Sequence, residues 1–256
     1  MQNGFILTPF FLDEPLPELE SLIKSDWYVN KPAMPDGDKQ HRMSSLHQLL
    51  ADFVAKTIAS GKRPVSIAGD CCTAIGVLAG LQRAGIDPLL IWFDAHGDFN
   101  TWETTPSGFL GGMPLAMLVG RGEQRMINAV GLHPFSESQV ILADARDLDP
   151  GEQDLLEESS VLHLPDTRSL IGHLLPDLPL YIHFDTDVIH PDDAPAMNYL
   201  APGGPDGAGL QEVFGYLAQT GRIVAASVST WNPSLDKDRR SERVCMELLH
   251  TLIEAN

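Results

Sequence analysis

The sequence has few cysteines, few basic residues and no long apolar run, and each shortage excludes a class of protein. Only three cysteines occur in 256 residues, and Cys71 and Cys72 are neighbours, so the chain has no disulfide framework. The segment MQNGFILTPFFLDEP at the start has no basic region before its short apolar stretch, and no run approaches the roughly 18 apolar residues of a membrane span. We therefore expect a protein of the reducing cytoplasm.

Basic residues are outnumbered by acidic ones. The chain has 17 Lys and Arg against 35 Asp and Glu, which gives a formal net charge of −18. A protein of this sign repels the phosphate backbone of nucleic acids and anionic lipid surfaces. We expect neither as a partner, and we expect metal ions to neutralise a part of the acidic excess.

Short apolar runs alternate with amphipathic segments along the whole chain. Several runs are apolar throughout, as is typical of strands that helices cover on both faces. We predict one domain over residues 1–256, an α/β fold of three α/β/α layers around a mostly parallel sheet. The expected strands are 4–10, 64–69, 88–94, 139–143, 160–164, 179–185 and 222–229. The expected helices are 43–60, 72–84, 113–120, 151–158, 167–175, 208–219 and 241–254.

Two segments place acidic side chains at alternate positions directly after an apolar run. The segment IWFDAHGDFNT at 91–101 carries Asp94, His96 and Asp98, and YIHFDTDVIHPDD at 181–193 carries Asp185 and Asp187. Alternate residues of an extended chain share a face, and open parallel sheets bind ligands beyond the carboxyl ends of their strands. Because crowded carboxylates repel one another without a cation, the two segments predict a metal site.

The ligand types indicate which metal and which chemistry. Carboxylates with one or two softer ligands suit Mn²⁺ or a similar first-row ion, and this number of ligands suits two ions. Paired ions can generate a water-derived nucleophile at neutral pH. A single Asp at a strand end is commonly a turn or cap residue, but two clusters of equal spacing are not explained in that way. The sequence thus predicts metal-assisted hydrolysis.

Together with AGDCCTAIG at 68–76, these two motifs resemble the arginase/agmatinase (ureohydrolase) family. The resemblance covers about residues 70–233 and implies the three-layer arginase fold with two Mn²⁺ ions. It implies that Asp94 and Asp185 bridge the ions. It further implies that His96 and Asp187 complete one ion and that Asp98 binds the other.

Some positions depart from the family pattern. Cys71 replaces a His ligand. A thiolate can ligate a divalent metal, so we favour coordination over the alternative of a small buried apolar residue. Gly111 replaces a His that has a proton-transfer role in arginases, and Thr230 replaces a Glu that pairs with a guanidinium. His190 is a candidate replacement for the missing proton carrier, the alternative being a solvated loop His.

Other family positions are kept. Asn100, Thr105, Ser107 and Asp149 match residues that in arginases hold the carboxylate and amino group of a free amino acid, although each alone is an ordinary turn or cap residue. With Thr230 they form the predicted substrate-binding set. We therefore expect a small-molecule α-amino acid as the substrate.

The run GDFNTWETTPSGFLGGM at 97–113, with a Cys in the first ligand position, resembles the Nω-hydroxy-L-arginine hydrolases within this family. An N-hydroxylated guanidine is less basic than that of arginine and needs less help from an anionic partner or a general acid. We expect its hydrolysis to hydroxyurea and ornithine, with Asp98 passing a proton to the departing amine.

Three alternatives stay open at this stage. One is a family member of different specificity, such as an arginase or a formiminoglutamase-like enzyme. A second is a non-catalytic member that keeps the metal, and a third is a purely structural α/β domain with a capped acidic cluster. The chain ends soon after the expected helix 241–254, without the tail that trimeric arginases use between subunits, so we expect a monomer or a small homo-oligomer.

Overall fold

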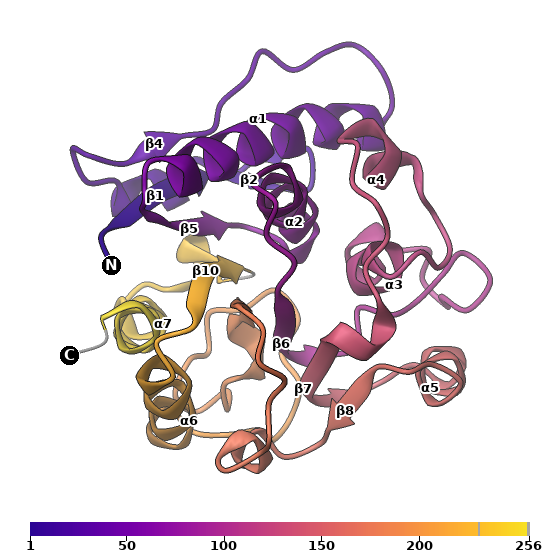
Figure 1. Ribbon diagram of the computed structural model, residues 1–256, viewed down its shortest axis with the longest axis vertical. Coiled ribbons are helices and arrows are strands. Elements are labelled where there is room, and N and C mark those ends of the chain that lie inside the picture. Colours follow the sequence, from indigo (N-terminus) through magenta and orange to yellow (C-terminus); the bar gives the residue numbers. More distant parts are fainter. Residues whose placement is uncertain (230, 255–256) are drawn as a thin grey trace.

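The computed structural model describes residues 1–229 and 231–254, and an eight-stranded sheet lies at its centre (Figure 1). The strand order is β4-β1-β5-β10-β9-β6-β7-β8, and the paired strands run parallel, which confirms the predicted sheet. The strands are β1 (Asn3–Thr8), β4 (Tyr28–Val29), β5 (Arg63–Ala68), β6 (Leu89–His96), β7 (Val140–Asp147), β8 (Leu162–Leu164), β9 (Leu180–Asp185) and β10 (Ile223–Ser229). A small antiparallel hairpin, β2 (Phe10–Phe11) and β3 (Glu14–Pro15), lies outside this sheet.

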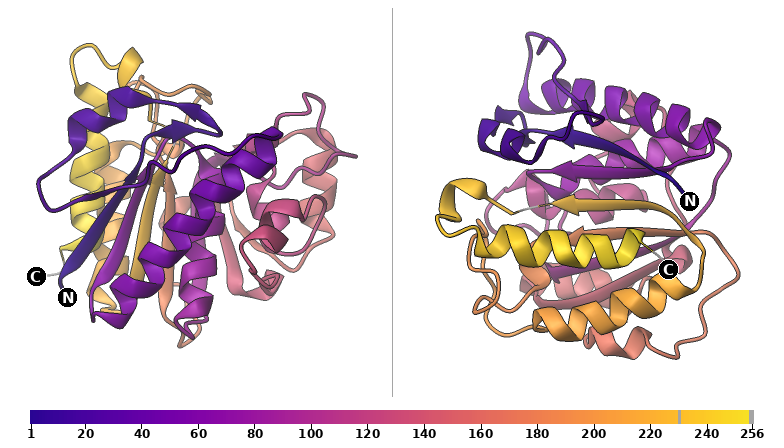
Figure 2. Two further views of the ribbon diagram at one scale, coloured as in Figure 1. Left: turned by 90° about the horizontal axis from the view of Figure 1, so that it is seen from above. Right: turned by 90° about the vertical axis from the view of Figure 1, so that its left-hand side faces the viewer.

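Helices cover both faces of the sheet. They are α1 (Lys39–Ala59), α2 (Ala74–Arg83), α3 (Pro114–Leu118), α4 (Arg125–Ala129), α5 (Pro150–Glu157), α6 (Gly207–Gln219) and α7 (Arg240–Ile253). Helices α1 and α2 lie on one face of the sheet, and α6 and α7 lie on the other (Figure 2). In β6, Trp92 packs in the core with residues of α1 and α2, whereas its neighbours Ile91 and Phe93 pack with residues of α6 and α7. The three-layer α/β/α fold is thus confirmed. None of the described helices combines the length and the hydropathy that a membrane crossing requires.

Local sequence explains where the elements differ from expectation. Helix α1 begins at Lys39 because the Asp38 side chain caps it by accepting a hydrogen bond from the His41 amide at 3.0 Å. The helix expected at 167–175 is wrong, since that segment forms only a 3-10 turn, Thr167–Leu170. The helical path ends at Ile171, which takes an extended backbone conformation, and Gly172 follows with a left-handed φ of 78°. The short helix α4, the edge strand β4 and the β2–β3 hairpin were not expected.

The chain order brings the motif-bearing strands together. From β5 the chain passes to β6, and β9 and β10 later enter the space between them, so that β5, β10, β9 and β6 are consecutive in the sheet. Because these strands are parallel, their carboxyl ends lie at one edge. A reversal of strand order of this kind opens a crevice at the carboxyl ends, where α/β proteins bind ligands.

Candidate metal centre and cavity

Potential metal ligands gather at this edge of the sheet. Each of three groups offers ligand atoms within 4.8 Å of one another. The groups are Asp94, His96 and Asp187; Cys71, Asp94 and Asp98; and Cys71, His183 and Asp185. The structure therefore brings together all six residues that the sequence predicts as metal ligands, and adds His183.

Backbone amides at the strand ends fix the carboxylates. The His96 amide donates to Asp94 Oδ1 at 2.7 Å, and the Trp92 indole Nε1 donates to Asp94 Oδ2 at 2.9 Å. The Asp187 amide donates in the same way to Asp185 Oδ1 at 3.0 Å. Each of these carboxylates thus accepts a bond from the amide two residues later. The i, i+2 spacing that marks the motif in the sequence also holds the ligands in place.

The charges around His96 favour a cation. Burial alone would lower the pKa of the imidazole, but hydrogen bonds and charge from Asp187 and Asp94, whose oxygens lie 3.1 and 3.4 Å from Nδ1, raise it to about 12. Burial would likewise raise the pKa of Asp94, but its hydrogen bond with His96 lowers it. For Asp187, burial and the charge of Asp94 prevail and raise the pKa to about 6. This part of the site stabilises positive charge.

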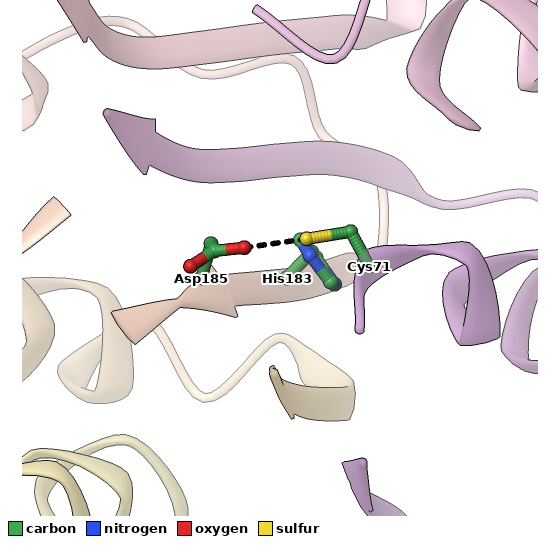
Figure 3. Close-up of side chains that lie close together, drawn as sticks. All are labelled: Cys71, His183 and Asp185. Atoms are coloured by element: carbon green, nitrogen blue, oxygen red, sulfur yellow. Dashed lines mark hydrogen bonds between the residues drawn. The ribbon is translucent and has the colours of Figure 1, made fainter. Parts of the chain in front are cut away.

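For Asp98 and Cys71, the effects that raise the pKa prevail. Burial, followed by the negative charges of Asp94 and Asp185, raises the pKa of Asp98 well above its usual range, and burial with the same neighbours raises the pKa of the Cys71 thiol. Asp98 Oδ2 is buried and accepts no hydrogen bond from the described residues. Cys71 Sγ lies 2.5 Å from Asp185 Oδ2, on a different segment (Figure 3).

A divalent cation would resolve both features. It would supply a partner for the orphaned carboxylate oxygen and would release the protons that burial and like-charge repulsion keep on the thiol and the carboxyl. Several carboxylates, one imidazole and one thiol suit a first-row ion, and the number of donor atoms suits more than one. The residues present therefore fit a metal centre.

A cavity of about 460 Å³ opens at these ligands. Its lining includes Cys71, His96, Asp98, Asp185 and Asp187 from the ligand groups, and also Asn100, Thr105, Ser107 and Asp149. Asn100 Nδ2 donates to Asp149 Oδ2 at 3.0 Å, which joins the two segments that carry these polar groups. The structure thus places four of the predicted substrate-binding residues in the same cavity as the candidate metal ligands.

Glu152 of α5 holds the loop after β6 in this position. Its carboxylate accepts from the Phe99 amide at 2.8 Å and from the Asp149 amide at 3.2 Å, and so links the segment after β6 with the start of α5. A Cβ at Gly97 would lie 2.7 Å from this carboxylate, so the loop can approach only with a glycine there. Burial raises the pKa of Glu152 to about 7.

The ring of Phe109 fills the space next to Gly111. A Cβ at position 111 would lie 2.4 Å from Phe109 Cε1, so the structure has no room for a larger side chain there while the ring stays in place. Phe109 packs against Tyr199 and Phe11, with ring centroids 5.2 and 6.3 Å apart, and all three rings line the cavity. Phe11 lies in no motif that would have marked it, whereas Phe109 lies within the run 97–113 and Tyr199 in the Gly- and Pro-rich loop 190–207. No feature of the sequence predicts that these three rings pack together.

Of the predicted site residues, His190 lies apart from this cavity and Thr230 is outside the described residues. His190 follows β9, is half-exposed, and accepts through Nδ1 from the Asp192 amide at 3.1 Å; it is not among the described residues that line the cavity. Thr230 lies outside the described residues. His183, fully buried behind Asp185, stacks on Trp92 with centroids 3.7 Å apart.

Comparisons with known proteins agree with this arrangement. The sequence model of the Arginase family matches residues 23–254. The arginase of Bacillus subtilis (strain 168) is 30% identical over 240 residues, which cover 88% of this chain and 81% of that protein. The N(omega)-hydroxy-L-arginine amidinohydrolase of Streptomyces lavendulae is 28% identical over 251 residues, 97% of this chain and 85% of that protein. The crystal structure of arginase from Bacillus subtilis superposes with a TM-score of 0.85 at 27% identity, covering 100% of this chain and 99% of that one. The chain belongs to the arginase family.

Proposed function

We propose that this ureohydrolase, which as a family member acts on C–N bonds, cleaves Nω-hydroxy-L-arginine with water to hydroxyurea and L-ornithine. One observation carries the proposal: a single cavity is lined both by the acidic, His and Cys side chains that could hold metal and by polar groups suited to a free amino acid. Two Mn²⁺ ions are the proposed cofactor. Their proposed ligands are Cys71, Asp94, His96, Asp98, Asp185 and Asp187.

Each residue of the cavity would have a role that follows from its chemistry. When bound, the ions supply an activated water at neutral pH. Asp98 would take up the proton that the water releases, on a carboxylate oxygen that does not bind metal, and would give it to the departing amine of ornithine. Asp149 would pair with the α-ammonium group of the substrate. The amide of Asn100 and the hydroxyls of Thr105 and Ser107 would hold its carboxylate.

The hydroxylated guanidine suits the cavity better than that of arginine. It is less basic and more often neutral, so it requires neither a strong general acid nor an anionic partner at the guanidine end. Position 111 carries no side chain that could transfer a proton, and the ring of Phe109 occupies the adjacent space. Thr230 remains the residue that we predict near the guanidine end.

L-Arginine is the second candidate substrate, because a relative named arginase is 30% identical over 88% of this chain. The test is to load the purified protein with Mn²⁺, measure the metal content, and assay both amino acids in parallel for urea, hydroxyurea and ornithine. We expect about two ions per chain and a larger kcat/KM for the hydroxylated substrate. Faster turnover of arginine, with the hydroxylated compound ignored, would refute the substrate assignment.

Matched variants separate metal binding from general effects of charge. Asp94→Asn removes a proposed ligand and should lower both metal content and turnover, whereas Asp177→Asn makes the same change at a fully exposed position and should alter neither. Metal bound at full occupancy without turnover of any guanidine would instead favour a non-catalytic member of the family.

Two further variants test the assigned roles. Asp149→Asn should raise KM for the amino acid far more than for the corresponding carboxylic acid without the α-amino group, because that acid has no ammonium group for Asp149 to pair with. His190→Ala tests the predicted proton carrier, whose removal should cost about 10²–10⁴ in kcat if it takes part in proton transfer. An unchanged kcat would exclude His190 from the mechanism.

A further inference from the structure

A line of buried polar side chains connects the centre of the sheet to Cys71. The Tyr181 hydroxyl lies 2.7 Å from Ser227 Oγ, which lies 2.8 Å from His183 Nδ1. His183 Nε2 lies 3.3 Å from Ser229 Oγ, and Ser229 Oγ lies 3.3 Å from Cys71 Sγ. None of the five residues is more than 6% exposed, so these groups depend on one another for hydrogen bonds.

The register of two strands explains the line. Ser227 pairs with His183, and Ser229 pairs with Asp185, across the parallel strands β10 and β9. Because alternate residues share a face, Tyr181 and His183 point to the same side of β9, and Ser227 and Ser229 point to that side of β10. This is the side on which Cys71 lies, after the carboxyl end of β5. The line therefore follows from strand pairing and not from a mobile loop.

The donor and acceptor inventory gives the line one direction if Cys71 is a thiolate. A thiolate can only accept, so the Ser229 hydroxyl must donate to Sγ, and its oxygen then accepts from His183 Nε2–H. Burying a charge is costly, so the fully buried His183 is neutral and its Nδ1 accepts. The Ser227 hydroxyl donates to His183 Nδ1, and its oxygen in turn accepts from the Tyr181 hydroxyl. Each serine hydroxyl donates once and accepts once, the Tyr181 hydroxyl donates, and all four hydrogens of the line point toward the sulfur.

We propose that Ser229 and His183 are positioning residues that hold Cys71 as the thiolate ligand of a divalent cation. This rests on the metal centre of the proposed function and assigns roles to two residues that do not touch the substrate. Hydrogen bonds to a ligand atom fix its orientation and tune its donor strength. Sγ also lies 2.5 Å from Asp185 Oδ2, an atom of a second proposed ligand, so the line of hydrogen bonds ends where two proposed ligand atoms meet.

Cobalt(II) is the probe that tests the proposal, since a Co²⁺–thiolate bond gives a charge-transfer absorption band that carboxylate and imidazole ligands do not. Ser229→Ala should weaken Co²⁺ binding, measured by competition with a chelator, by roughly 10–100-fold and should shift the band. The matched control is Ser66→Ala, which removes another buried hydroxyl of the same sheet, one that has no hydrogen-bond partner among the described residues. It should change neither quantity.

Variants at His183 give a second, independent readout. His183→Phe keeps a ring against Trp92 but removes the Nε2–H donor, and should shift the band in the same direction as Ser229→Ala. His183→Gln supplies an amide N–H to Ser229 and should restore part of the band position and affinity. Metal-free thermal unfolding of each variant reports whether it folds.

The outcomes separate this proposal from the one on which it rests. If Ser229→Ala and His183→Phe lower the unfolding temperature but leave the Co²⁺ affinity and the band unchanged, the line only packs two strands and the positioning role is refuted. Co²⁺ binding by the unaltered protein without a thiolate band refutes Cys71 as a ligand but leaves the hydrolase proposal standing. No binding of Co²⁺ or Mn²⁺ at all refutes both.

Discussion

Replacing Gly111 with Ala tests the finding that the Phe109 ring fills the space beside that position. The added Cβ would lie 2.4 and 2.5 Å from two ring carbons, against about 3.5–4.0 Å for an ordinary carbon–carbon contact. The ring cannot turn aside freely, because it packs against Tyr199 and Phe11. Overpacking of this kind costs about 1–3 kcal/mol of unfolding free energy, and the partly exposed ring favours the lower half of that range.

A double-mutant cycle isolates the contact. Phe109→Ala alone loses ring packing, but in its background Gly111→Ala meets no ring and should cost almost nothing. The coupling energy should therefore be at least about 1 kcal/mol, within the usual range for residues in contact. Urea unfolding in the presence of a chelator measures each corner without stabilisation by bound metal. If Gly111→Ala costs the same in both backgrounds, Phe109 does not limit position 111 and the reasoning fails.

The same contact bears on the chemistry. Gly111→His alone should lower the hydrolysis rate, because it displaces the ring, whereas in the Phe109→Ala background the imidazole gains room. A general acid or base contributes about 10²–10⁴ in rate, so even partial alignment should raise hydrolysis of L-arginine at least about tenfold over Phe109→Ala. No gain in arginine turnover, with the double variant folded, would count against the view that the missing imidazole limits the reaction.

Three further predictions follow from other parts of the molecule. Burial lowers the pKa of His47 to about 3. Because the unfolded chain binds the proton from about pH 6.5 downward, the free energy of unfolding should fall by about 5 kcal/mol as the pH drops from about 6.5 to 3. His47→Leu should flatten urea-derived stability across that range, and an unchanged acid slope would refute the assignment. Arg63, 5% exposed, donates to the Ile253 carbonyl at the end of α7, so Arg63→Met should cost about 2–4 kcal/mol in the same assay. Mn²⁺ at about 100 times its Kd should stabilise the unaltered protein by about 2.7 kcal/mol in thermal unfolding but should leave Asp94→Asn, which lacks a proposed ligand, close to its metal-free value.

Much of the architecture could be predicted from local sequence. The continuous apolar runs that become β6 and β9 are readable as buried strands, because a strand covered on both faces has no polar positions to alternate with apolar ones. The acidic motifs follow the same runs, and their i, i+2 spacing predicts that Asp94 and His96 lie close together at the end of β6. Asp98 lies beyond the strand with a left-handed φ of 50°, and it is this loop conformation that brings it next to Asp94. The helix predicted for 167–175 is wrong, because the backbone becomes extended at Ile171 and left-handed at Gly172.

Only the tertiary structure decided which distant segments meet at the site. The strand order β5-β10-β9-β6 brings Cys71 within 3.3 Å of Ser229 although 158 residues separate them, and it makes the polar line through His183 continuous. Phe109 lies within the run 97–113, but only its packing in the folded chain shows that it limits what position 111 can hold. The physical reason is that strand identity and ligand spacing depend on each residue's near neighbours, whereas cavity shape and hydrogen-bond direction depend on contacts that exist only once the sheet has assembled.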